Sequence, residues 1–290
     1  MSTTDQNKEL KALVSMLDEP DSLVYDQIRS RIHAFGMDAI PVLEARWEDS
    51  FDPLLQERIE EIIHRIHFDD LQAALSSWVQ LGNDDLLKGF MMVARYQYPD
   101  INAEKVIKQV GQLVQDVWLE LNSSLTALEK IKVVNHILFD VHKYKGNKSN
   151  IKSPDNLYLN TLLETKKGNP LSIGILYIII ARSLKLPVYG VDLPNHFVLA
   201  YLEDFPGSDE SPDQVNALFY INPFNRGTLF THNEIEAYIR QMNLPHNETY
   251  FNPCTNITII RRVFDELIDL HEMLGNKGKV EELKKLAAVL

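Results

Sequence analysis

The stretch from Lys166 to Ala181 reads KKGNPLSIGILYIIIA and decides the fold of this chain. A tight polar turn opens directly into a helix that is apolar on nearly every side. Asn169 is a favourable N-cap residue, and Pro170 suits the first position of a helix. Because a helix that is apolar all round must be buried, the middle of the protein is expected to pack against residues 173–181.

The composition bounds the class of protein. The chain has 290 residues, of which 45% are hydrophobic, and its formal net charge is -12. An acidic surface argues against non-specific binding to nucleic acid or to anionic membranes. The single cysteine, Cys254, excludes an intrachain disulfide and a cysteine-rich zinc site. The start of the chain is polar and resembles no signal peptide, and no apolar run is long enough to span a bilayer, so we expect a cytoplasmic protein.

The residues before the turn predict a largely helical chain. Apolar residues recur at helical spacing in residues 10–17, 24–32, 39–47 and 54–66, and the short connections contain Asp, Gly and Pro. This pattern predicts a helical layer over residues 1–70 that resembles HEAT repeats, with an ordinary helical subdomain as the alternative. Further helical segments are predicted at 71–78, 84–95, 103–121 and 125–142.

After the buried helix the period of the sequence changes. Residues 187–193, 197–202 and 217–221 read as strands, separated by an acidic loop at 203–215. Residues 231–242 read as a helix with a capping box formed by Thr231 and Glu234. Residues 255–290 read as two helices that resemble a tetratricopeptide hairpin. The predicted class is α+β and mostly helical, with the buried helix against a small antiparallel sheet and with domains at 1–70, 71–245 and 246–290.

The order of these motifs resembles the transglutaminase-like superfamily, which shares its core with papain. In that superfamily a Gly-x-Cys turn opens a helix, a His opens a strand, and Asp-Pro closes the next strand. A closer resemblance is to the invasion-gene-regulator (Sir B type) family. Its later motifs correspond here to LPNHF, from Leu193 to Phe197, and to NPFN, from Asn222 to Asn225. The resemblance covers roughly residues 85–240, and the C-terminal helix pair also resembles that family.

The resemblance implies a role for each motif residue. In active members a thiolate attacks an acyl carbon, a His transfers the proton and an acid orients the His. Counted back from Pro187, the Gly-x-Cys motif falls on Gly168-Asn169-Pro170, so the nucleophile position holds Pro170. The His position holds His196. The acid position holds Asn222, whose amide can orient a His but cannot stabilise an imidazolium by charge.

Two alternatives to a lost nucleophile remain. Ser172 offers a hydroxyl near the turn, but it lies about 200° around the helix from position 170 and can instead bond free backbone groups of the first turn. Cys254 lies in a predicted loop, where a structural thiol is the usual case. His196 is either a core histidine bonded to Asn222 or a backbone carbonyl, or part of a binding pocket.

The sequence therefore predicts a catalytically degenerate protein that acts as a binding or regulatory scaffold for an unidentified protein partner. The alternative is an acyl-transfer enzyme or a peptide or amide hydrolase that uses Ser172 with His196 as base. The expected remnant site comprises His196, Asn222 and Ser172, and the expected pocket comprises Gly168, Asn169, Pro170, Asn195 and Phe224. The sequence carries no phosphate-binding loop, dinucleotide fingerprint or His-Glu-x-x-His motif, so no cofactor and no metal is expected.

Overall fold

The structure is a computed structural model that describes residues 3–194, 196–203, 216–243, 247 and 250–290. The chain divides into two compact units, Met1–Ser77 and Trp78–Leu290. Most residues are helical, and a small antiparallel sheet and a small parallel pair of strands complete the fold, which confirms the predicted α+β class. The domain boundaries predicted at 70 and 245 stay predictions, as does the separate C-terminal domain.

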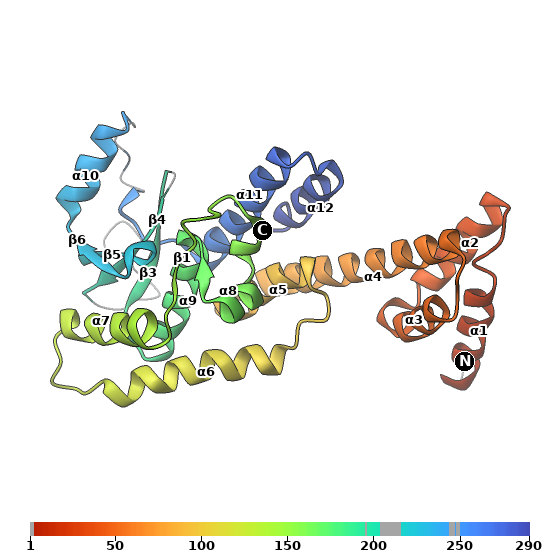
Figure 1. Cartoon of the computed structure of the whole chain (residues 1–290), viewed down its shortest axis with the longest axis horizontal. Helices are drawn as coiled ribbons and strands as arrows, with labels where there is room; N and C mark the ends of the chain where they lie inside the picture. Colours follow the sequence, from red (N-terminus) through yellow and green to blue (C-terminus); the bar gives the residue numbers. More distant parts are fainter. Residues whose placement is uncertain (1–2, 195, 204–215, 244–246, 248–249) are drawn as a thin grey trace. The chain divides into compact units, whose positions relative to one another are not determined.

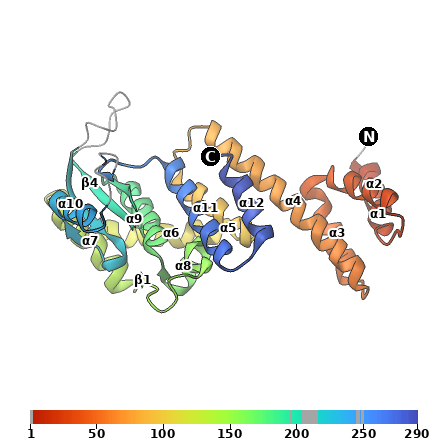
Figure 2. The same cartoon turned by 90° about the horizontal axis from the view of Figure 1, so that it is seen from above.

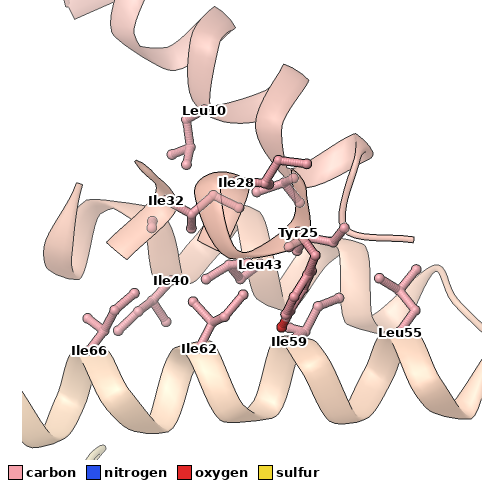
Figure 3. Close-up of a cluster of buried hydrophobic side chains, with 13 residues drawn as sticks. Leu10, Tyr25, Ile28, Ile32, Ile40, Leu43, Leu55, Ile59, Ile62 and Ile66 are labelled. Carbon is pink, nitrogen blue, oxygen red and sulfur yellow. The ribbon is translucent and has the colours of Figure 1, made fainter. Parts of the chain in front are cut away.

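The first unit is a helical layer with its own core (Figure 3). It contains α1 (Thr3–Ser15), α2 (Ser22–His33), a 3-10 turn (Gly36–Ala39), α3 (Ile40–Glu48) and the first part of α4 (Pro53–Gln80). The side chains that meet in this core come from all four helices, and Ile32, Leu43 and Ile59 are completely buried. The predicted apolar stripes therefore form a core, although the likeness to HEAT repeats remains a prediction.

Two details of this unit differ from the prediction. The segments predicted at 54–66 and 71–78 are one continuous helix, α4. Val24, Trp47 and Leu54, which belong to the predicted stripes, are exposed, whereas Tyr25 is buried in the core. The aromatic ring of Tyr25 also lies against the Arg58 guanidinium, 4.1 Å from ring centroid to Cζ, so a polar neighbour helps to hold it.

The second unit contains the predicted buried helix, α9 (Pro170–Ser183), and every residue from Leu171 to Ala181 is buried. Besides α9, the helices of the unit are α5 (Leu86–Gln97), α6 (Ala103–Glu120), α7 (Ala127–Asn135) with a π-helical extension (His136–Val141), α8 (Leu159–Thr165), α10 (His232–Gln241), α11 (Asn256–Met273) and α12 (Lys277–Ala287). Of the helices of this unit, α5, α6, α8 and α11 pack against α9, and Figure 1 shows the unit with all its helices. In this unit α11 packs against both α5 and α12 (Figure 2).

The main sheet of the unit has the strand order β3-β4-β5-β6 and is antiparallel throughout. Its strands are β3 (Val188–Leu193), β4 (His196–Leu202), β5 (Ala217–Asn222) and β6 (Thr228–Phe230). The first three were predicted, and β6 was not. A parallel pair, β1 (Lys145–Gly146) and β2 (Lys167–Gly168), ties the turn before α9 to the loop after the π-helix. Most of the acidic loop predicted at 203–215 lies outside the described residues.

The two faces of the main sheet pack against different helices. Phe197 and Leu199 of β4 face α9, since a methyl group on Gly174 would lie 2.8 Å from Phe197 and 3.5 Å from Leu199. Successive side chains of a strand point to opposite faces. Val198 and Ala200 accordingly pack with Ile235 and with other residues of α10 on the second face. His196 shares the parity of Val198, so it belongs to the α10 face.

Candidate functional site

The turn that opens α9 is closed by its own hydrogen bonds. Asn169 is the N-cap, and its Oδ1 accepts from the backbone N–H of Ser172 at 2.8 Å. In return the Ser172 hydroxyl accepts from the backbone N–H of Asn169 at 3.1 Å. This reciprocal pair is a capping box, and Ser172 is completely buried within it. The predicted cap is confirmed, and the Ser172 hydroxyl is occupied by backbone groups of the turn.

Pro170 occupies the first position of α9, where its missing N–H costs no hydrogen bond. Its ring carries neither a nucleophile nor a titratable group. Gly168 precedes the cap, and a side chain there would overlap the Ser172 hydroxyl. Phe224 packs instead on Gly146 of β1, where any β-carbon would overlap its ring. Close packing of small residues therefore holds the turn in place.

A chain of charged side chains ties this turn to α11. The Nδ2 of Asn169 donates to a carboxylate oxygen of Glu266 at 2.8 Å. Arg262 donates to the other oxygen of Glu266 at 3.4 Å and also pairs with Asp192 of β3. Burial raises the pKa of Glu266, and the nearby Arg262 and the bond from Asn169 lower it in part. The sequence carried no signal for Glu266, because it lies about 100 residues away on a helix with ordinary amphipathic spacing.

His196 stands on the other face of the sheet. Its imidazole is exposed and meets the ring of Tyr238 of α10 edge to face, with ring centroids 5.0 Å apart. The Tyr238 hydroxyl donates to the carbonyl of Pro194 at 2.9 Å and so anchors α10 to the turn before β4. Sequence reasoning missed Tyr238, although its position one turn after Glu234 places both on the same side of α10.

A cleft of about 260 Å³ joins His196 to Asn222. Its apolar wall includes Leu193, Val198, Leu229 and Tyr238, and its polar rim includes Asn225 and Glu234. The Asn222 side chain accepts from the backbone N–H of Asn225 at 3.1 Å, which fixes the turn between β5 and β6. The volume is below the range of pockets for drug-sized ligands and matches a single side chain or a small group.

The structure thus brings two sets of predicted residues together in two places. Gly168, Asn169, Pro170 and Ser172 form the turn at the start of α9, while His196 and Asn222 line the cleft under α10. Phe224 belongs to neither set and packs on β1. Asn195 lies outside the described residues.

Cys254 lies in a different environment. Burial raises the pKa of its thiol to about 12, and the nearby Arg182 lowers it only in part. Its backbone N–H donates to the carbonyl of Gly190 at 2.7 Å. A thiol with such a pKa is protonated at neutral pH and is a poor nucleophile.

Within residues 3–194, 196–203, 216–243, 247 and 250–290, no group of three or more His, Cys, Asp or Glu side chains is placed to hold a metal ion. Among the same residues, no helix is both apolar and long enough to cross a lipid bilayer.

Comparison with known proteins places the site in a family. Residues 104–265, more than half of the chain, match the profile of the transglutaminase-like superfamily. The matched region contains α9, the main sheet, the cleft and most of α11. No solved structure matches the chain significantly.

Two kinds of relative are similar over different lengths. A UPF0162 protein of Xylella fastidiosa is 27% identical over 227 residues, which cover 74% of this chain and 76% of that protein. F-box only protein 21 of Mus musculus is 28% identical over 176 residues, 61% of this chain but only 25% of that protein. The human F-box only protein 21 is 30% identical over 133 residues, 46% of this chain and 20% of that protein.

Proposed function

This chain belongs to the transglutaminase-like superfamily, and we propose that it is a catalytically degenerate member that acts as a binding scaffold for a protein partner. The observation that carries the proposal is the separation of the two predicted site halves. The Ser172 hydroxyl is buried in the cap of α9, while His196 faces α10 across the sheet. A hydroxyl and a base on opposite faces of a sheet do not make a nucleophilic pair, which requires hydrogen-bond contact.

The residues at the family positions support the same proposal. Pro170 stands where the superfamily has its Cys, and Asn222 stands where it has its Asp. Cys254 does not replace the lost thiol, because its raised pKa keeps it protonated. The finer resemblance to the invasion-gene-regulator family, with a tetratricopeptide-like end, stays part of this proposal.

The retained part of the site is suited to binding. The cleft offers an apolar wall, an aromatic ring and the exposed imidazole of His196, and it is sized for one side chain. Small pockets with an aromatic anchor are typical of the sites where one protein receives a side chain of another. Relatives named F-box only protein 21 carry this region as a minor part of a longer chain, which fits a module that serves an assembly.

The enzymatic alternative is tested on the purified chain. We expect equal background rates for wild type, Ser172→Ala and His196→Ala with p-nitrophenyl acetate and in ammonia release from a glutamine-containing peptide. Turnover by wild type that both substitutions abolish would establish the hydrolase and refute the scaffold.

Binding at the cleft is tested by photocrosslinking in cells. A benzophenone amino acid at Leu229, which lines the cleft, is compared with the same probe at the exposed Leu274, which lies outside it. We expect a discrete adduct from position 229 that weakens with His196→Ala, and none from position 274. The same adducts from both positions, or none from position 229, would contradict the proposal.

A further inference from the structure

Helix α6 carries two apolar faces, and the described part of the chain buries one of them. Val106, Val110, Leu113 and Val117 are buried. A second stripe runs through Ile107, Gly111, Val114 and Trp118, about 100° around the helix from the buried face. Ile107 is 52% exposed and Trp118 is 63% exposed. This second stripe, Ile107 to Trp118, is called the outer stripe below.

The first three residues of the outer stripe form one wall of a groove of about 510 Å³. Ile107, Gly111 and Val114 line it from α6. Leu87 of α5 and Ile179 of α9 line it from the opposite side. The groove is therefore an apolar trough between helices of the second unit, and it lies apart from the cleft at His196, with which it shares no residue.

Gly111 is the unusual residue of this groove. Glycine in the interior of a helix destabilises it relative to alanine, so an interior glycine needs a reason. The other interior glycines of neighbouring helices have one: a methyl group on Gly89 would lie 2.8 Å from Trp78, and one on Gly174 would lie 2.8 Å from Phe197. A methyl group on Gly111 would meet nothing within 4 Å. Packing within the described chain gives no reason for this glycine, whereas close approach of another backbone would.

The charges around the groove select the kind of partner. Asp84 and Asp85, both exposed, line it where α5 begins. Arg182 also lines it, but its Nε donates to the Val188 carbonyl at 3.1 Å and its Nη1 to Asn256 at 2.9 Å. The guanidinium is thus directed into the protein, and the two exposed charged side chains that line the groove, Asp84 and Asp85, are acidic.

We propose that the outer stripe and its groove bind an amphipathic helix of another protein, which sets a small residue against Gly111 and a Lys or Arg against Asp84 and Asp85. In helix-in-groove recognition an amphipathic helix lays its apolar face into a hydrophobic groove. From Ile107 to Trp118 the stripe rises about 16 Å, the length of three helical turns. A second copy of this chain is a poorer occupant, because it brings its own net charge of -12 and the same two aspartates.

The test uses the full chain and two fluorescent peptides of about 18 residues. Both peptides consist of Ala, Leu and Gln arranged to form an amphipathic helix. One carries three Lys residues at one end, and the other carries three Glu residues there. We expect anisotropy to detect binding of the Lys peptide and at least roughly tenfold weaker binding of the Glu peptide. Asp84→Asn should weaken binding of the Lys peptide. Amide hydrogen exchange should show that residues 104–119 become protected when the Lys peptide binds.

Gly111 supplies the decisive variants. In Gly111→Leu the new side chain fills the space that the partner's backbone would occupy, so binding of the Lys peptide should weaken about tenfold or more. Gly278→Leu, at the start of α12 and equally open, is the matched control and should leave binding unchanged. Gly111→Ala should raise the Tm by roughly 2–4 °C, because alanine favours the helix more than glycine does. It should also weaken binding of the Lys peptide, because the partner needs the glycine and the fold does not.

Four results would overturn the proposal. They are undetectable binding of the Lys peptide to wild type, equal binding by Gly111→Leu and wild type, loss of stability in Gly111→Ala, and self-association of the chain that Gly111→Leu abolishes. The third would mean that the fold itself needs the glycine. The fourth would assign the groove to a second copy.

Discussion

The two faces of the β3–β6 sheet differ in how completely helices cover them. The face toward α9 is closed: Phe197, Leu199 and the residues of α9 from Leu171 to Ala181 are buried. The face toward α10 is closed only in part and keeps a cleft with the exposed His196 at its edge. The polar residues of the turn on the first face serve the fold, and on the second face Asn222 and Tyr238 also hold turns in place, whereas the imidazole of His196 is exposed. The difference separates the turn at the start of α9, which is closed by its own hydrogen bonds, from the cleft at which we propose that a partner binds.

Adjacent residues of β4 give the largest contrast between the faces. Phe197→Ala should lower the free energy of unfolding by about 3–5 kcal/mol, because it leaves a cavity between the sheet and α9. His196→Ala should lower it by about 0.5 kcal/mol, since it removes only an exposed edge contact with Tyr238. Urea unfolding of both variants measures the difference. Similar losses at the two positions would mean that the faces are not distinguished as described.

The hydroxyls at the two ends of α9 give a smaller contrast. Ser172→Ala should cost about 1–2 kcal/mol, because it leaves the buried N–H of Asn169 without its acceptor. Ser183→Ala is the matched control. Its hydroxyl donates to the Ile179 carbonyl at the exposed end of the helix, and its loss should cost less than about 0.5 kcal/mol. Thermal unfolding of the pair checks this, and an equal effect would show that the capping box contributes little.

The smallest effect concerns Glu266 behind the turn. Because burial raises its pKa above the ordinary value of 4.5, the folded state binds the proton more tightly than the unfolded state. The contribution of this group to stability is therefore complete below about pH 4.5 and is lost as the pH rises through the folded pKa. Glu266→Gln keeps an acceptor for the Asn169 side chain and removes the loss of stability at higher pH, because glutamine does not titrate.

The measurement is the free energy of unfolding of wild type and Glu266→Gln between about pH 4.5 and pH 7. As the pH rises, the free energy of unfolding of Glu266→Gln should increase relative to that of wild type. Glu272→Gln, a half-exposed carboxylate on the same helix, is the control for loss of one negative charge. Parallel curves for wild type and Glu266→Gln would contradict the assigned effect of burial.

The sequence predicts the local parts of this molecule well. Asn169 and Pro170 mark the start of α9, the change of period marks β3 to β5, and Thr231 with Glu234 marks the start of α10, where the Thr231 N–H donates to Glu234 at 2.7 Å. These features depend on neighbours within a few residues. The short strand β6 and the pair β1–β2 escape prediction, because two or three residues carry too little periodicity.

The arrangement of the site was harder to predict from the same residues. Motif order places His196 and Pro170 together as members of one family site, but the face on which a strand residue lies depends on which alternate set packs against the helix. Phe197 packs against α9 because Gly174 and Gly190 leave room for its ring. That choice turns His196 toward Tyr238. It depends on contacts between distant segments, as does the bond between Asn169 and Glu266.

The most direct test restores the missing thiol. In Pro170→Cys the new thiol stands at the start of α9, and its reaction with iodoacetamide is followed from pH 6 to pH 9, where Cys254 stays protonated because of its pKa of about 12. The start of the helix lowers the pKa of the new thiol whether or not a base is near. The comparison is therefore with Pro170→Cys/His196→Ala. The separation of the faces predicts the same pH midpoint of alkylation in both proteins. A midpoint at least about one pH unit lower in Pro170→Cys, restored to the higher value by His196→Ala, would show a thiolate–imidazolium pair and contradict the account.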